Sequence, residues 1–310
     1  MSEHKFSIEA IKVNKRYKGG ESVKDALTDF NLNIPKGSIY GLLGPNGAGK
    51  STFINILGGL VKKNSGEVNI CGINIDTDAK ASRKKIGIVP QELNIDPFFT
   101  PIELLELQAG LYGVAKKNRK SEEILLNVGL LDQRNAYART LSGGMRRRLL
   151  VAKALVHDPE IIVLDEPTAG VDVNLRNSLW AYIKRLNDKG TTICLTTHYL
   201  EEAEMLCDYI TIINKGKVIK NDTKNNLLKL IGKKTVSFIL ENKITEIPSS
   251  LTKFNVSLNN NQLTVNYDKN LIQLKAIIEI LNISKIPFSE INTYESDLED
   301  IFLDLIKKND

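Results

Sequence analysis

The segment GPNGAGKST at 44–52 constrains this chain most, because it joins an apolar run to a glycine-rich turn and to the start of a helix. The run before it, KGSIYGLL at 36–43, is consistent with a buried strand. Gly44, Gly47 and Gly49 allow the backbone to turn tightly and to bring its N–H groups close to phosphate oxygens. The segment therefore predicts a strand, a phosphate-binding loop and a helix in succession, and with them a nucleotide-binding domain of the α/β class.

Two side chains of this loop carry specific chemistry. Lys50 would reach the β- and γ-phosphates of a nucleotide, and the Ser51 hydroxyl would bind Mg²⁺. The helix that begins near Lys50 adds the positive end of its dipole. The predicted nucleotide-binding loop comprises Gly44, Pro45, Asn46, Gly47, Ala48, Gly49, Lys50, Ser51 and Thr52.

A second segment, IIVLDEP at 161–167, places two carboxylates at the end of an apolar strand. Four apolar residues in succession fit a strand that is buried on both faces of a parallel sheet. Asp165 and Glu166 then fall at the carboxyl end of the strand, where open α/β sheets bind ligands. We assign Asp165 to Mg²⁺, directly or through water, and Glu166 as the general base or orienting group for the attacking water. The alternative is that both acids cap the next helix, with Pro167 in its first turn.

His198 ends a similar apolar strand, TTICLTTH at 191–198. It is one of only three histidines in the chain, and it falls on the same edge of the same predicted sheet as the two acids. A lone histidine is more often structural than catalytic. Its place at this edge favours a catalytic role, in which it hydrogen-bonds the γ-phosphate and the attacking water.

The segment LSGGM at 141–145 is a second glycine-rich turn, and it opens the helical sequence MRRRLLVAKAL. It is a second anion site in a chain that already has one. Two half-sites in one chain indicate two copies of the chain that complete each other's nucleotide site. Arg146, Arg147 and Arg148 resemble a nucleic-acid-binding patch. On a helix they would spread over most of a turn, so we interpret them as a solvated face.

Six segments occur in a fixed order: GPNGAGKST, IGIVPQ ending at Gln91, LSGGM, IIVLDEP, AGVD at 169–172, and TTH ending at His198. In this order and spacing they resemble the nucleotide-binding subunit of an ATP-binding-cassette (ABC) transporter. The resemblance implies a P-loop NTPase core of the ABC ATPase type, with an inserted helical subdomain. It also implies an ATPase that uses ATP and Mg²⁺, and a homodimer that drives separate integral-membrane permease subunits.

The resemblance extends to individual residues. Gln91 is similar to the glutamine that touches Mg²⁺ and links the site to the membrane partner; the alternative is an ordinary polar loop residue. Tyr17 is similar to the aromatic residue that stacks on adenine; the alternative is a tyrosine of an edge strand. Asp172 is similar to the acid that contacts the opposite subunit. Met145 departs from the glutamine commonest at its position. The signature residues that would cover the γ-phosphate held by the other subunit are Ser142, Gly143 and Gly144, and the implied Mg²⁺ ligands are Ser51, Gln91 and Asp165.

The pattern along the chain predicts an ATPase domain over residues 1–232 and a small α/β extension over 233–310. Apolar residues at three-and-four spacing predict a helical subdomain over about 92–155. Its surface near Gln91 and Phe98-Phe99 is a candidate dock for a membrane subunit. The alternative is that both phenylalanines belong to the core.

In the extension, alternating segments flank an Asn-rich turn at 259–261, and LIQLKAIIEILNIS has a helical pattern. A last helix is predicted from a capping box and an apolar stripe. The ending ESDLEDIFLDLI resembles the C-terminal extension of type-2 (ABC-2) exporter ATPases, and the chain as a whole resembles the YadG-like group of that branch. Dimer contact is our hypothesis for this extension. The capping box is Ser296 to Glu299, and the stripe is Leu298, Ile301, Phe302, Leu305 and Ile306.

Composition excludes several classes of protein. A hydrophobic share of 42%, a charged share of 25% and a net charge of +5 are ordinary for a soluble chain and give no reason to expect nucleic acid as a partner. No run approaches the roughly 18 apolar residues of a spanning helix. The segment MSEHKFSIEA lacks the apolar core of a signal peptide. We therefore expect a cytoplasmic chain, peripheral on the cytoplasmic face of the inner (plasma) membrane and without a covalent membrane anchor. The three cysteines have no paired spacing, which argues against zinc and disulfides; they are Cys71, Cys194 and Cys207.

The sequence thus favours the ATP-hydrolysing subunit of an exporter. Two alternatives remain. One is an importer ATPase whose C-terminal domain senses a small molecule. The other is a soluble ATPase of the same superfamily that acts on DNA or ribosomes, although the long insertions or second cassette of such proteins are not visible. The LEDIF ending favours the exporter.

Overall fold

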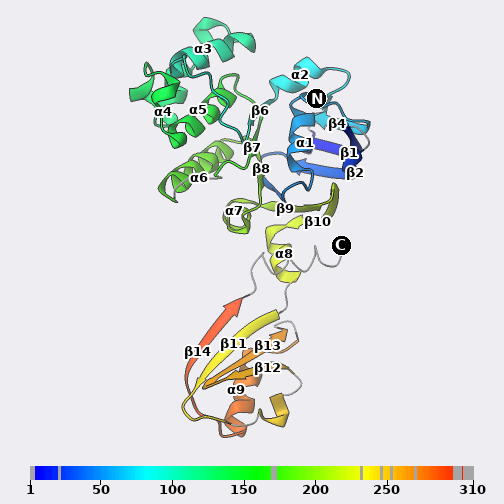
Figure 1. The fold of residues 1–310 in the computed structure, drawn as a ribbon, viewed down its shortest axis with the longest axis vertical. Coiled ribbons are helices and arrows are strands. Elements are labelled where there is room, and N and C mark those ends of the chain that lie inside the picture. The colour runs from blue at the N-terminus through cyan, green and yellow to red at the C-terminus, as the bar shows by residue number, and fades with distance from the viewer. Residues whose placement is uncertain are drawn as a thin grey trace. The chain divides into compact units, whose positions relative to one another are not determined.

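The computed structural model describes residues 4–19, 22–168, 173–230, 233–244, 247–251, 254–268, 271–295 and 302 (Figure 1). The chain divides into two compact units, Met1–Asp222 and Thr223–Asp310. Each is described below by itself. Among the described residues, none of the helices has both the length and the apolar character that crossing a bilayer requires.

The first unit contains an antiparallel sheet in the strand order β2-β1-β4-β5. The two long strands form a hairpin whose inward side chains, such as Ile8, Val13 and Phe30, are fully buried. Apolar and polar residues alternate along parts of both strands, which is typical of a sheet buried on one face. The strands are β1 (Phe6–Gly19), β2 (Ser22–Pro35), β4 (Ser65–Ile70) and β5 (Ile73–Asn74).

A six-stranded sheet in the order β10-β9-β3-β8-β7-β6 forms the centre of this unit (Figure 1). The pairs β3–β8, β3–β9, β7–β8 and β6–β7 are parallel. Every residue of β3, β7 and β8 is buried, as the apolar runs of β3 and β7 predict. In β8 the buried residues include three threonines. The loops that follow these strands therefore meet at one edge of the sheet. The strands are β3 (Ile39–Leu43), β6 (Ile86–Val89), β7 (Ile161–Asp165), β8 (Thr192–Thr197), β9 (Tyr209–Asn214) and β10 (Lys217–Thr223).

Between β6 and β7 lies the helical subdomain, in which α3, α4 and α5 pack against one another (Figure 1). A capping box fixes the start of α3, because Thr100 and Glu103 each accept a hydrogen bond from the other's backbone N–H. Leu105 and Leu149 are buried in the core of this subdomain. The expected inserted helical subdomain is therefore confirmed. The helices of the first unit are α1 (Lys50–Leu57), α2 (Ala79–Lys84), α3 (Pro101–Leu111), α4 (Ser121–Asn127), α5 (Gly143–Leu155), α6 (Val173–Asp188) and α7 (Leu200–Leu206).

The second unit contains an antiparallel sheet in the order β12-β13-β11-β14. Asn260 turns between β12 and β13 with φ 53°, so the predicted Asn-rich turn is a hairpin turn. Ile277 and Leu281 of α9 pack against Phe238 and Leu263 of the sheet. The predicted capping box and apolar stripe lie outside the described residues, apart from Phe302. The elements are α8 (Lys224–Leu230), β11 (Lys233–Leu240), β12 (Asn255–Asn259), β13 (Gln262–Asp268), α9 (Leu274–Ile283) and β14 (Phe288–Glu295).

Candidate functional site

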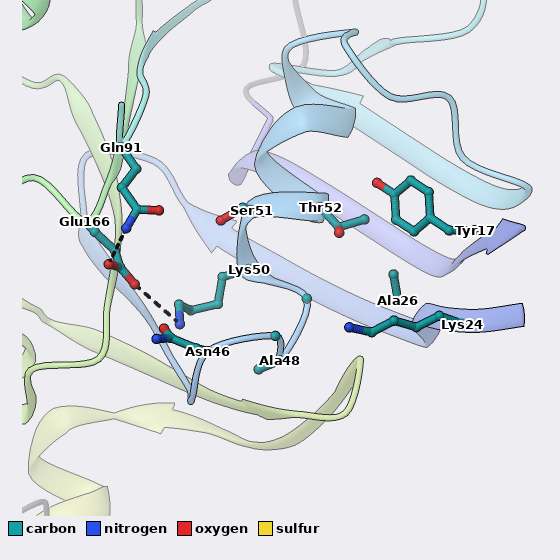
Figure 2. Close-up of a pocket in the computed structure, with 12 residues that line it drawn as sticks. Tyr17, Lys24, Ala26, Asn46, Ala48, Lys50, Ser51, Thr52, Gln91 and Glu166 are labelled. Carbon is teal, nitrogen blue, oxygen red and sulfur yellow. Dashed lines mark hydrogen bonds and ion pairs between the residues drawn. The ribbon is translucent and has the colours of Figure 1, made fainter. Parts of the chain in front are cut away.

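A pocket of about 370 Å³ opens over the loop between β3 and α1 (Figure 2). Gly47 and Gly49 adopt φ of 79° and 110°, a left-handed region in which most side chains are strained. A Cβ on Gly44 would lie 2.4 Å from the backbone oxygen of Ile213, so this position has no room for a side chain. The pocket is lined by Tyr17, Lys24, Ala26, Asn46, Gly47, Ala48, Gly49, Lys50, Ser51, Thr52, Gln91 and Glu166.

Lys50 lies at the base of this pocket with only 5% of its surface exposed. Its Nζ donates to the backbone oxygens of Gly44 at 2.6 Å and Pro45 at 3.2 Å, and lies 3.8 Å from Glu166 Oε1. Burial lowers the pKa of Lys50, and the negative charges of Glu166 and Asp165 oppose that shift. An anion bound in the pocket would therefore pair with a Lys50 ammonium group that is already desolvated and held in place.

Glu166 is the point at which three segments of the chain meet. Gln91 Nε2 donates to its Oε2 at 2.9 Å, and His198 Nδ1 lies 3.1 Å from its Oε1 (Figure 2 shows the bond to Gln91). The Glu166 backbone adopts φ 46°, and its N–H bonds Thr196 Oγ1 at 3.0 Å. Such a conformation is uncommon for a residue other than glycine and points to a constrained site. The structure thus brings together Gln91, Glu166 and His198, as the positions of their strands predict.

Asp165 lies at the end of β7 and is buried, with 6% of its surface exposed. The Thr196 hydroxyl donates a hydrogen bond to its Oδ1. Across the residues that the structure describes, no cluster of three or more His, Cys, Asp or Glu side chains can hold a metal by itself. A donor set of one carboxylate, one amide and one hydroxyl fits Mg²⁺, which keeps waters and takes further ligands from substrate phosphates. The residues present therefore fit the predicted metal.

The signature residues lie apart from this pocket. Ser142 caps α5, and its Oγ accepts a hydrogen bond from Met145 N at 3.2 Å. Ser142 and Gly143 are exposed, and Gly144 is half-buried. None of the residues from 141 to 145 lines the pocket in their own chain. Asp172 lies outside the described residues.

The interpretation of the three arginines as a solvated face is wrong. Arg147 is 5% exposed, and burial lowers its pKa. Its Nη1 donates to Pro90 O at 2.8 Å and its Nη2 to Gln91 O at 2.9 Å. Arg146 Nε bonds Leu141 O at 3.2 Å, and Arg148 Nη1 bonds the backbone oxygens of Val128 and Gly129. Successive helix positions point in different directions, so each guanidinium reaches a different set of backbone carbonyls.

The aromatic predictions have separate outcomes. Tyr17 lines the pocket and is 39% exposed, and Lys15 Nζ lies 4.8 Å from the centroid of its ring. Stacking on adenine stays a prediction. Phe98 is 68% exposed, whereas Phe99 packs against the core of the helical subdomain. The alternative that both phenylalanines are core residues is therefore wrong for Phe98 and right for Phe99.

Sequence reasoning missed Lys24 and Ala26, which line the pocket from β2. Lys24 is the antiparallel partner of Tyr17, and its Nζ lies 4.0 Å from the position of a Cβ on Gly47. Figure 2 shows its amino group directed toward the phosphate loop. The signal that could have found them is the hairpin pairing, because a residue opposite Tyr17 must share its face of the sheet.

An α/β core in which a phosphate loop and a strand-end carboxylate meet at one pocket is typical of the P-loop ATPases. Comparison with known proteins narrows this class. The ABC transporter family profile matches residues 27–169. The chain is 38% identical over 241 residues to the linearmycin resistance ATP-binding protein LnrL of Bacillus subtilis (strain 168), and the match covers 77% of this chain and 76% of that protein. It is 41% identical over 223 residues to the Nod factor export ATP-binding protein I of Cupriavidus pinatubonensis (strain JMP 134 / LMG 1197), across 71% of this chain and 67% of that one.

Among solved structures, the dimeric post-hydrolysis state of the ATP-binding cassette MJ0796 bound to ADP and Pi matches with a TM-score of 0.65 and 33% identity. The match covers 70% of this chain and 98% of that one. The chain therefore belongs to the ABC transporter family, as an ATP-binding subunit that hydrolyses ATP.

Proposed function

We propose that this chain is the ATPase subunit of an exporter and that two copies close around two Mg-ATP to drive a separate membrane permease. The observation that carries the dimer is the separation within one chain between the nucleotide pocket and the signature residues. Ser142 caps its own helix and does not line the pocket that contains Lys50. A site that uses both therefore needs two chains.

In the proposed dimer the two chains lie head to tail about a two-fold axis. Each ATP is held by Lys50, Ser51 and Glu166 of one chain and by Ser142 and Gly144 of the partner subunit. Because both chains hold the γ-phosphate, ATP binds the closed state more tightly than the open one and shifts the equilibrium toward closure. Hydrolysis removes this bridge, and the dimer opens.

We assign the chemical roles from the geometry of the pocket. Glu166 accepts the proton of the attacking water or orients it, and His198 contacts the γ-phosphate and that water. When bound, Mg²⁺ would be held by Ser51, Gln91 and Asp165 and would offset charge on the phosphate oxygens. Tyr17 stacks on adenine.

Export is supported by two of the relatives, which are a Nod factor export protein and a linearmycin resistance protein. The resemblance of the C-terminal sequence to the type-2 exporter branch, and to its YadG-like group, points the same way. The exported substrate would be selected by the permease.

For the permease dock we propose the surface of the helical subdomain next to Gln91. A pocket of about 280 Å³ lies there between the end of α1, β6, α3 and α5, and its lining includes Leu60, Pro90 and Tyr112. Leu60 and Leu111 are 79% and 75% exposed, which gives the surface an apolar character. Docking there would hold the chain on the cytoplasmic face of the plasma membrane. We further propose residues 1–232 as the ATPase domain and 233–310 as an extension that contributes to dimer contact.

The test is the variant Glu166→Gln in Mg-ATP. It removes the carboxylate needed for turnover and keeps a side chain of the same shape. We expect hydrolysis to fall by about 10²–10⁴-fold and an ATP-dependent dimer to accumulate in size-exclusion chromatography with light scattering. Glu123→Gln, an exposed acid outside the pocket, is the matched control. If the Glu166→Gln variant stays monomeric at saturating Mg-ATP, closure around nucleotide is wrong.

A further inference from the structure

The turn that carries His198 is tied to a buried carboxyl group, that of Glu202 on α7. Glu202 is 1% exposed, and the hydroxyl of Thr197 donates to its Oε2 at 2.8 Å. The same hydroxyl oxygen accepts a hydrogen bond from the backbone N–H of Tyr199 at 2.9 Å. One hydroxyl group therefore bridges the residues on either side of His198, and Glu202 determines where its proton points.

Glu202 belongs to the buried part of α7, where Ala203 and Leu206 are buried as well. Within the described part of the chain, its second oxygen, Oε1, is buried without a hydrogen-bond partner. Burial raises the pKa of Glu202, the Thr197 hydrogen bond and the positive charge of Arg176 oppose that shift, and the charge of Glu166 adds to it. A buried carboxyl group with one oxygen that lacks a hydrogen-bond partner costs stability. The hydrogen bond that it accepts from Thr197 best explains its presence at this position.

We infer that Glu202 is a positioning residue for ATP hydrolysis, which acts through Thr197 to fix the turn that presents His198 to Glu166. Glu202 does not line the nucleotide pocket, so it has no direct contact with ATP in this role. The contact that it stabilises is the one between His198 Nδ1 and Glu166 Oε1, at 3.1 Å. This inference rests on the role proposed above for His198.

Removal of the carboxyl should affect turnover rather than nucleotide affinity. In Glu202→Ala the Thr197 hydroxyl loses its acceptor on α7 and keeps only the longer contact with the Tyr199 backbone oxygen at 3.4 Å, so the turn is held less firmly. Misplacement of a catalytic group by about 1 Å can cost about 100-fold in rate. We expect Glu202→Ala to lower kcat at least about tenfold and to leave the KM for ATP within about twofold, because no residue that lines the pocket is changed.

Conservative variants separate the hydrogen bond from the charge. Glu202→Gln keeps an oxygen acceptor at the same distance and should retain most of kcat. Thr197→Val removes the hydroxyl and should reproduce Glu202→Ala, whereas Thr197→Ser keeps it and should not. Glu201→Ala is the matched control, because the neighbouring Glu201 side chain is 71% exposed.

The decisive comparison is made in a His198→Ala background. If Glu202 acts only through His198, Glu202→Ala lowers kcat in the wild-type background and does not lower kcat further in the His198→Ala background. A role in folding alone would lower activity by the same factor in both backgrounds, and that result would overturn the inference.

Nuclear magnetic resonance of the full-length chain gives a second readout that does not depend on turnover. The chain has three histidines, so the ring resonances of His198 can be assigned by single substitution. They should shift in Glu202→Ala and Thr197→Val and stay in place in Glu202→Gln. His157, which stacks on Tyr112 at 3.7 Å, provides an internal reference. Unmoved His198 resonances in Glu202→Ala would contradict the inference. Full activity of His198→Ala would instead contradict the proposed role of His198.

Discussion

Arg147 holds the backbone of Gln91: its Nη2 donates to the Gln91 carbonyl at 2.9 Å while the Gln91 side chain bonds Glu166. A buried guanidinium on α5 is thus one residue removed from the Glu166 carboxylate. We expect Arg147→Lys, which cannot bond two carbonyls as a planar fork, to lower the free energy of unfolding by about 1.5–3 kcal/mol. It should also reduce kcat. Urea titration and steady-state kinetics measure both effects, and Arg185→Lys on α6 is the control. An unchanged stability would show that the two carbonyl contacts contribute nothing net.

Lys50 should impose a pH dependence on the stability of the nucleotide-free protein. Burial holds its pKa in the folded chain below the ordinary lysine value of 10.5, so the unfolded chain binds the proton more tightly. The free energy of unfolding therefore gains a contribution as pH rises through the interval between the folded pKa and 10.5.

In Lys50→Met this contribution is absent and ATP binding is lost. The stability of the wild type relative to this variant should increase with pH, and urea titrations between about pH 8 and about pH 10 measure it. A difference in stability that does not change with pH would contradict the depressed pKa.

Tyr17 provides a test of adenine stacking. The loss of an aromatic platform costs about 1–3 kcal/mol per base, so Tyr17→Ala should weaken ATP binding by about 5- to 150-fold. Tyr17→Phe should bind nearly as well, because stacking needs the ring and not the hydroxyl group. Fluorescent ATP titrations measure the affinity. Equal losses in the two variants would indicate a hydrogen bond through the phenol in place of stacking.

The signature residues predict a defect in turnover without a defect in binding. Ser142→Arg places a bulky cation on the surface turn that the partner subunit's nucleotide would approach. We expect hydrolysis to be abolished while ATP still binds to the pocket of the same chain, as measured by equilibrium dialysis. Thr140→Arg, two residues earlier, is the control. Loss of ATP binding in Ser142→Arg would place the signature residues in the pocket of their own chain.

The cysteines should be unreactive in the folded protein. None of the three, all of which lie in the described part of the chain, forms a disulfide. Burial raises the pKa of the Cys71 thiol to about 11 and that of the Cys194 thiol to about 12, and Cys207 is buried. Thiolate is the reactive form, so titration with Ellman's reagent at about pH 8 should be slow in buffer and give three thiols in denaturant. Rapid reaction of one thiol in buffer would show that its burial is transient.

The parts of this molecule that the sequence predicts best are those governed by an unbroken pattern. The strands that end in Leu43, Asp165 and Thr197 are buried along their whole length, and their residue patterns alone indicate a parallel sheet. Because parallel strands end at a common edge, the meeting of Glu166 with His198 follows from the same patterns.

Predictions from the sequence fail where tertiary packing determines which side chains are buried and which line the pocket. A run of three arginines looks like a solvated face, since the sequence does not show that carbonyls of Pro90 and Gln91 lie within reach of Arg147. Phe98 and Phe99 have the same chemistry, and only the packing of the helical subdomain distinguishes the exposed ring of Phe98 from the partly buried ring of Phe99. Lys24 was not predicted as a pocket residue, because its position there depends on the pairing of β1 with β2.

The carboxylate of Glu166 has two oxygens, and two separate segments of the chain each use one of them. A displacement of the Gln91 segment would strip one oxygen of its donor, and a displacement of the His198 turn would strip the other. If Glu166 activates water as proposed, it does so efficiently only while both segments are in place. In the proposed complex, a force that the permease exerts near Gln91 would therefore change the rate of ATP hydrolysis.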